Sequence, residues 1–224
     1  MAARIPGEPV GHAAAQAAGD GPVVGVLGLQ GDVLEHVTML RSTGATAVLV
    51  KRAEELERID GLVIPGGEST TIGKLADMYG LLDPLRKAID SGLPVLGTCA
   101  GAILLSQRAL FADGAPSEQP LIGALAATAR RNAFGRQVAS FEVDLDVDGI
   151  AGGPLHAVFI RAPWFEEVGD QVTVLASVDT PDGPRAVVVR QGAVLAAAFH
   201  PELSGDARLH QVFVDMVGAG ARTR

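Results

Sequence analysis

Short hydrophobic runs alternate with amphipathic segments over the first half of the chain. The runs are nearly continuous in Val, Leu, Ile, Ala and Gly, which is typical of parallel strands covered on both faces. They lie at 23–29, 45–50, 61–64 and 94–96. Helical segments are expected between them, at 33–43, 53–59, 72–78 and 81–91. We expect Asp32 to cap the first helix and Gly44 to end it.

The second half of the chain has a different pattern. Strand-like segments joined by Gly, Pro and Asp turns follow one another at 138–147, 155–160, 172–177, 185–190 and 194–199, before a closing helix at 204–217. The sequence therefore predicts an α/β fold, a three-layer sandwich with a mostly parallel central sheet plus some antiparallel strands. We expect one domain at 22–220, after a flexible N-terminal extension at 1–21 that is rich in Ala, Gly and Pro.

Composition narrows the functional classes. The formal net charge is −8 and no basic run exceeds two residues, which argues against a nucleic-acid partner. No apolar run approaches the length of a membrane span, and residues 1–21 lack the apolar core of a signal peptide. A single cysteine excludes an internal disulfide and is compatible with the reducing cytoplasm, where we expect the protein.

That cysteine lies at a predicted strand-to-helix turn, in Gly97-Thr98-Cys99-Ala100-Gly101. The spacing is that of a nucleophile elbow, in which glycines two residues either side permit a tight turn. A thiol at a helix N-terminus also has its thiolate favoured. A buried structural cysteine explains the residue equally well.

A second glycine-containing loop, Pro65-Gly66-Gly67-Glu68-Ser69-Thr70-Thr71, follows another predicted strand. It lacks the GK[ST] ending of a phosphate-binding loop and the third glycine of a dinucleotide fingerprint. An ordinary strand-to-helix loop, in which Ser or Thr caps the helix, would have the same sequence pattern. Parallel sheets bind ligands beyond the C-terminal ends of their strands, so this loop and Cys99 share the expected binding edge.

His200-Pro201-Glu202 follows the last predicted strand. A thiolate nucleophile needs a base that a third group holds in orientation. Proline keeps His200 extended, and in extended chain the side chains at i and i+2 project to the same face. Glu202 can therefore orient His200. The other histidines, His36, His156 and His210, have no comparable setting, and no metal site is expected.

Together these motifs resemble the class I, triad-type glutamine amidotransferases, whose sheet is flavodoxin-like. Further motifs resemble the glutaminase subunits of pyridoxal 5′-phosphate synthases. These are LGLQGDVLEH (27–36), PGGESTT (65–71), RNAFGRQ (131–137), FIRAP (159–163) and FHPEL (199–203). The resemblance extends from about residue 23 to the closing helix.

The resemblance implies a glutaminase without a cofactor. Its catalytic triad would be Cys99, His200 and Glu202, and backbone N–H groups of Ala100 and Gly67 would form the oxyanion hole. The residues that it implies for binding L-glutamine are Gly67, Glu68, Ser69, Arg131, Ile160 and Arg161. From the sequence alone, surface ion pairs explain the two arginines as well.

The resemblance also implies a partner, a (β/α)₈-barrel synthase subunit in a large hetero-oligomer, which would receive ammonia and activate the glutaminase. Two enzymatic alternatives remain open: a glutaminase subunit of another biosynthetic amidotransferase, or a DJ-1/PfpI-like cysteine hydrolase. A non-catalytic subunit that has kept the fold is a third possibility.

Overall fold

The computed structural model describes residues 21–135 and 140–221. Its large sheet contains β1 (Val23–Leu27), β2 (Thr46–Val50), β3 (Gly61–Ile64), β4 (Val95–Thr98), β5 (Ser106–Leu110), β6 (Leu125–Arg130), β9 (Trp164–Val168), β10 (Thr173–Thr180), β11 (Gly183–Gln191) and β12 (Val194–Ala197). A two-stranded sheet contains β7 (Ser140–Leu145) and β8 (Leu155–Ile160). The helices are α1 (Val33–Ser42), η1 (Ala53–Arg58), α2 (Ser69–Met78), α3 (Leu82–Asp90), α4 (Ala100–Leu105), η2 (Pro201–Leu203) and α5 (Arg208–Ala221).

The strand order of the large sheet is β2-β1-β3-β4-β12-β11-β9-β6-β5, and β10 pairs with β11. The strands β2, β1, β3, β4 and β12 run parallel to one another, whereas β11 is antiparallel to β12 and to β9. The expected combination of a mostly parallel sheet with some antiparallel strands is therefore confirmed.

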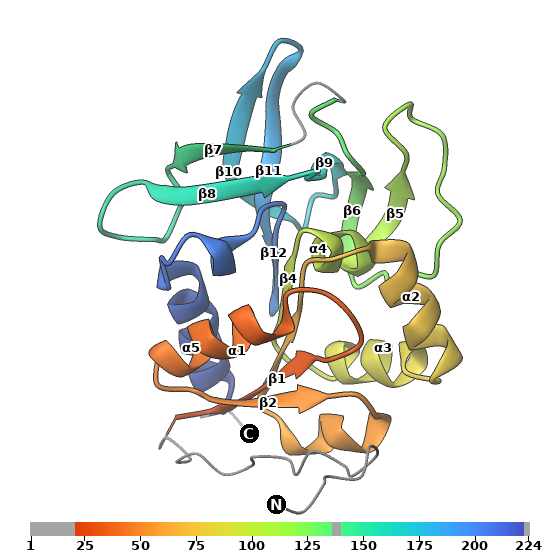
Figure 1. Cartoon of the computed structure of the whole chain (residues 1–224), viewed down its shortest axis with the longest axis vertical. Coiled ribbons are helices and arrows are strands. Elements are labelled where there is room, and N and C mark those ends of the chain that lie inside the picture. The colour runs from red at the N-terminus through yellow and green to blue at the C-terminus, as the bar shows by residue number, and fades with distance from the viewer. Residues whose placement is uncertain (1–20, 136–139, 222–224) are drawn as a thin grey trace, which may run out of the picture.

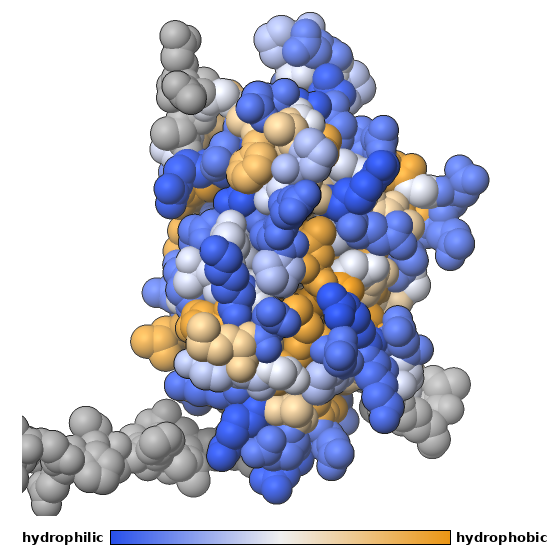
Figure 2. Space-filling view, turned by 90° about the vertical axis from the view of Figure 1, so that its right-hand side faces the viewer, coloured by the Kyte–Doolittle hydropathy of each residue, from blue (hydrophilic) through white to orange (hydrophobic). Residues whose placement is uncertain are grey.

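Alternate residues of the central strands enter two separate hydrophobic cores. Val63 and Leu96 belong to the core that also contains residues of α1 and α5, whereas Ile64 and Val95 belong to the core with α2 and α3. Figure 1 shows the two helical layers on opposite sides of these strands. The side of the molecule with α2 and α3 is mostly hydrophilic, with smaller hydrophobic patches between the polar side chains (Figure 2). The expected three-layer architecture is confirmed.

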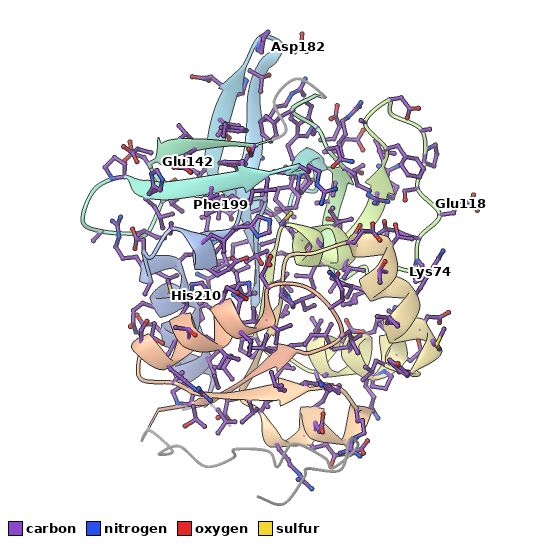
Figure 3. The ribbon with its side chains drawn as sticks, in the orientation of Figure 1. Lys74, Glu118, Glu142, Asp182, Phe199 and His210 are labelled. Carbon is purple, nitrogen blue, oxygen red and sulfur yellow. The ribbon has the colours of Figure 1, made fainter. Side chains whose placement is uncertain are left out.

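The small sheet, β7 and β8, packs on the core that contains residues of α1 and α5, beside the C-terminal end of β12. Phe159 of β8 is fully buried, stacked on Phe141 of β7, with ring centroids 4.5 Å apart. It also meets Phe199, which follows β12 and is labelled in Figure 3. The backbone N–H of His200 donates to the carbonyl of Val158, 2.9 Å away. The small sheet thereby fixes the backbone that carries His200.

Several sequence expectations need correction. The helix predicted after Cys99 is present and is six residues long, but three strands, β5, β6 and β9, were not predicted. Asp32 stands at the N-cap of α1 but its side chain makes no capping hydrogen bond. The α2 helix is capped by the Glu68 side chain rather than by Ser or Thr, since Glu68 accepts from the N–H groups of Thr70 and Thr71. The expected extension at residues 1–20 lies outside the described residues.

Among the described residues, no helix has the length and apolar character needed to cross a membrane. The parallel strands β1, β3, β4 and β12 all end at one edge of the sheet. The segments that follow them therefore meet there, and they carry the residues that the sequence singled out.

Candidate active site

Cys99 stands at the turn between β4 and α4, as predicted. Its backbone has φ 44° and ψ −100°, a conformation that non-glycine residues rarely adopt. Two hydrogen bonds hold the turn: the Cys99 N–H donates to the carbonyl of Ala197 on β12, and the Cys99 carbonyl accepts from the N–H of Ile103. Strain at a residue held on both sides in this way is characteristic of functional turns.

Glycines are needed around this turn because backbone segments approach one another closely. A Cβ on Gly101 would lie 2.0 Å from the carbonyl oxygen of Ile64 at the end of β3. A Cβ on Gly66 would lie 2.4 Å from Cε1 of His200, so this loop packs directly against the imidazole ring. The two glycine motifs of the sequence are therefore parts of one site.

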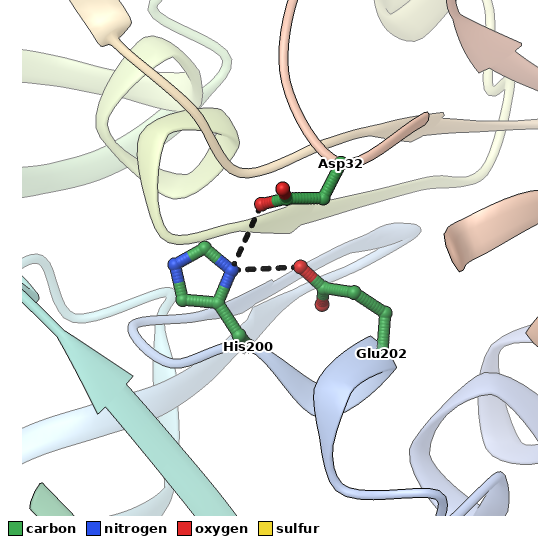
Figure 4. A group of neighbouring side chains, drawn as sticks. All are labelled: Asp32, His200 and Glu202. Carbon is green, nitrogen blue, oxygen red and sulfur yellow. Dashed lines mark hydrogen bonds and ion pairs between the residues drawn. The ribbon is translucent and has the colours of Figure 1, made fainter. Parts of the chain in front are cut away.

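His200 and Glu202 interact as the His-Pro-Glu spacing predicts. Nδ1 of His200 donates to Oε1 of Glu202, 2.7 Å away, and both side chains are buried. Nδ1 also lies 3.2 Å from Oδ2 of Asp32, so the imidazole faces two carboxylates (Figure 4). This contact explains why Asp32 does not cap α1. Because Nδ1 is engaged, Nε2 is the ring nitrogen left for Cys99.

The surroundings of His200 favour its charged form. Burial acts to lower the pKa of His200, but interactions with the Cys99 thiol and the Glu202 carboxylate outweigh it and raise the pKa to about 10. Burial raises the pKa of Glu202 above its usual range, while the contact with His200 acts in the opposite direction. The arrangement is suited to a thiolate–imidazolium pair oriented by a carboxylate.

Three of the residues expected to bind L-glutamine, Glu68, Ser69 and Arg131, form a polar cluster at the N-terminus of α2. Arg131 donates to Oε1 of Glu68 at 2.9 Å and to Oε1 of Gln119 at 2.9 Å. Ser69 also donates to Gln119, a buried residue that the sequence did not single out. Burial acts to raise the pKa of Glu68, but hydrogen bonds from Thr71 and other neighbours outweigh it and lower the pKa. Arg131 thus forms an ion pair with Glu68. An ion pair was the alternative explanation that the sequence left open for this arginine.

Ile160 is the last residue of β8, and Arg161 follows it. The carbonyl oxygen of Ile160 is 3.9 Å from Sγ of Cys99. Arg161 is exposed and has φ 45°. The Ala133 N–H donates to the carbonyl of Ala162, 3.0 Å away, which links this segment to the one that carries Arg131.

Two histidines that the sequence did not single out lie behind the triad. His36 of α1 and His210 of α5 are completely buried, and His36 Nδ1 is 2.9 Å from His210 Nε2. Figure 3 labels His210. His36 Nε2 is 3.0 Å from the hydroxyl of Thr98 and 3.4 Å from Oε2 of Glu202. His36 therefore contacts the carboxylate that orients His200, and His210 contacts His36, an arrangement that the sequence did not indicate.

Asp32, His200 and Glu202 are also the one group in the described part of the chain whose geometry could hold a metal ion, with ligand atoms within 4.8 Å of one another. The His200 nitrogen in this group is the one that already donates to Glu202. We therefore assign the three side chains to an acid–base arrangement.

Comparison with known proteins agrees with this geometry. The model of the SNO glutamine amidotransferase family matches residues 26–219, most of the chain. This chain belongs to the SNO glutamine amidotransferase family. The family that the motifs suggested is confirmed.

Individual relatives of this SNO family member are similar over nearly their whole length. A protein of Frankia alni named pyridoxal 5′-phosphate synthase subunit PdxT is 59% identical over 91% of this chain and 99% of its own length. A protein of the same name from Nocardia farcinica is 58% identical over 91% of this chain and 89% of its own. A crystal structure of a glutamine amidotransferase is 52% identical, with a TM-score of 0.79, over 87% of this chain and 98% of its own. These matches favour a glutaminase of this family over a DJ-1/PfpI-like hydrolase.

Proposed function

We propose that this chain is the glutaminase subunit of a pyridoxal 5′-phosphate synthase. It hydrolyses L-glutamine to L-glutamate and delivers the ammonia to the synthase subunit. The observation that carries the proposal is the buried bond from His200 to Glu202, 2.7 Å long, beside the only cysteine of the chain. The names of the relatives support the synthase as the assembly, since both carry the name pyridoxal 5′-phosphate synthase subunit.

Cys99 is the nucleophile of the proposed reaction. Its proton passes to His200, and the thiolate attacks the side-chain carboxamide carbon of L-glutamine. When the tetrahedral intermediate collapses, the C–N bond breaks and His200 returns the proton to the leaving nitrogen as ammonia. Water then attacks the glutamyl thioester, which gives L-glutamate and the free thiol. Glu202 keeps the imidazole oriented and stabilises the imidazolium through both steps.

Backbone N–H groups of Ala100 and Gly67 are the proposed oxyanion donors, typically worth about 10²–10³ in rate each. Gly67 has φ 148°, and a Cβ there would lie 2.6 Å from Oε1 of Gln30. The carbonyl of Gly66, in the same peptide unit as the Gly67 N–H, accepts from the Asp32 N–H at 3.2 Å. This hydrogen bond ties the peptide to the N-terminus of α1, so a change there could release it.

The substrate's charged groups would meet the polar cluster of α2 and the segment after β8. Arg131 and Arg161 suit the α-carboxylate, because a guanidinium can donate two parallel hydrogen bonds to it. Glu68 suits the α-ammonium group. Ser69 and the backbone of Gly67 and Ile160 complete the proposed binding site.

The partner in this proposal is a (β/α)₈-barrel synthase subunit in a large hetero-oligomer. We place the assembly in the cytoplasm, where a thiolate nucleophile stays reduced. The glutaminase is expected to be nearly idle alone, and to become active when the partner sets the Gly66-Gly67 peptide.

The test is ammonia release from L-glutamine, measured with and without the synthase subunit. Cys99→Ala should abolish release and leave binding of the synthase subunit intact, and retained hydrolysis would refute the nucleophile. Full activity of the chain alone would contradict activation by the partner. Capture of a different synthase as the assembling partner would support the alternative, a glutaminase of another biosynthetic amidotransferase.

A further inference from the structure

Glu202 has one carboxylate oxygen that the triad does not use. Oε1 accepts from His200, but Oε2 is fully buried and has no hydrogen-bond donor in bonding geometry among the residues described. Leaving a buried carboxylate oxygen unpaired is costly. Its polar neighbour is Nε2 of His36 at 3.4 Å, and both side chains are completely shielded from solvent.

The proton positions on the two buried histidines follow from their partners. If Nε2 of His36 carries the proton, it points toward Thr98 and Glu202, and Nδ1 accepts from the N–H of His210. The opposite tautomer would turn a lone pair toward the Glu202 carboxylate. It would also leave the N–H at Nδ1 of His210 buried without an acceptor, because that atom has no partner in the structure. The first arrangement leaves neither histidine with an unpaired N–H, so the N–H edge of His36 faces Thr98 and Glu202.

We propose that His36, held in this tautomer by His210, is a positioning residue that keeps Glu202 ionised and aligned with His200. The inference rests on the catalytic triad of the proposed function. Among the residues described, the polar contacts of the His36 side chain are with His210, Thr98 and Glu202, and the proposed role acts through Glu202.

The charges around His36 are consistent with a neutral donor. The titratable groups that face it are His210 from α5 and Glu202 and His200 from the segment after β12. Burial, His210 and His200 together hold the pKa of His36 well below its usual value. Burial lowers the pKa of His210 to about 4. Both rings therefore stay neutral at physiological pH, and His36 offers an N–H dipole rather than a second cation.

Two substitutions at His36 separate this role from simple packing. His36→Gln places an amide N–H near the position of Nε2, so it keeps the donor toward Glu202. His36→Asn places its amide near Nδ1, so it keeps the contact with His210 and loses the donor. Both variants replace a buried ring by a smaller amide, which makes them a matched pair.

The first measurement is kcat for ammonia release from glutamine by the full chain with its synthase subunit. We expect His36→Asn to lower kcat about tenfold at unchanged KM, because the N–H dipole that faces the Glu202 carboxylate at 3.4 Å is lost. His36→Gln should stay within about threefold of the unsubstituted chain. His156→Asn is the control, since His156 is on the exposed face of the small sheet and a surface change should stay within about twofold.

The second measurement is the pH profile of iodoacetamide alkylation, which reports only Cys99 because the chain has no other cysteine. A poorly aligned Glu202 stabilises the imidazolium less, so thiolate alkylation should need a higher pH. The midpoint should rise by about one pH unit in His36→Asn and stay unchanged in His36→Gln. A purely structural role would lower the melting temperature of both variants without moving this midpoint.

Unchanged kcat and midpoint in His36→Asn, or equal losses in the two variants, would overturn the inference. If His36→Asn does not fold, His210→Asn decides by the same readouts, since it removes the ring that fixes the tautomer of His36 and should shift both in the same direction. Cys99→Ala separates the two proposals. If it retains hydrolysis, the proposed function fails, whereas an inactive Cys99→Ala beside a normal His36→Asn rejects the role of His36 alone.

Discussion

The buried histidine pair should make the folded state sensitive to mild acid. Burial lowers the pKa of His210 to about 4, against 6.5 for a free histidine. The unfolded chain therefore binds a proton at a higher pH than the folded chain does. The stability that comes from this difference is fully present above pH 6.5 and is lost as the pH falls toward 4. His36 acts in the same direction, because its pKa is lowered as well.

The magnitude follows from linkage. With a pKa of about 4 when folded and 6.5 when unfolded, His210 alone costs about 2 kcal/mol of unfolding free energy between pH 7 and pH 5. That is a large part of the stability of a typical domain. This loss of unfolding free energy at acid pH should therefore be visible in ordinary denaturation experiments.

The assay is urea unfolding of the full chain and of His210→Gln at pH 7 and pH 5. Glutamine keeps an N–H toward His36 but does not titrate, so the variant should lose about 2 kcal/mol less than the unsubstituted chain between the two pH values. His156→Asn is the control with the opposite sign. Hydrogen bonds that His156 donates to Asp144 and Glu142 raise the pKa of His156, so removing this histidine cannot reduce acid sensitivity. Equal losses in His210→Gln and the unsubstituted chain would refute the reasoning.

Two further changes test the elbow and the substrate cluster. Gly101→Ala puts a Cβ 2.0 Å from a backbone carbonyl and should lower the unfolding free energy by about 3 kcal/mol, whereas Gly218→Ala, where no atom lies within 4 Å, should be neutral or stabilising; equal melting temperatures would contradict this. Arg131→Lys cannot donate to Glu68 and Gln119 together, so KM for glutamine should rise about tenfold with a smaller change in kcat, and an unchanged KM would remove Arg131 from the site.

The sequence predicts the centre of the fold better than its edge. Strands β1, β3 and β4 are buried on both faces and keep continuous hydrophobic runs, so they are found correctly. The strands that were missed lack continuous hydrophobic runs of this kind. β5 reads SQRAL and β9 reads WFEEV, with exposed polar residues that carry ion pairs such as Arg108–Glu167. Their strand character comes from pairing with neighbours far along the chain, which no local pattern records.

The residues of the proposed triad could be singled out from the sequence because their constraints are local. A nucleophile elbow needs glycines at a fixed spacing. A base and the carboxylate that orients it can lie within three consecutive residues, as His200 and Glu202 do. The Asp32 contact with His200 was not predictable in this way. Asp32 has the residue type and position of a helix cap, and only the meeting of the β1 and β12 edges shows that its carboxylate is used by His200.

The two buried histidines show that the sequence held a further signal, a histidine at a core position of a helix. His36 lies on the hydrophobic face of α1 with Val33, Val37 and Leu40, and His210 precedes Phe213 on the buried face of α5. A histidine at a core position of a helix needs a polar partner, because burying an unpaired imidazole is costly. Two helices on the same face of one sheet, each with such a histidine, can therefore provide the polar partner for one another. Here the two histidines are 174 positions apart in the sequence. Once the pair is placed there, the remaining N–H of His36 faces the Thr98 hydroxyl and the Glu202 carboxylate.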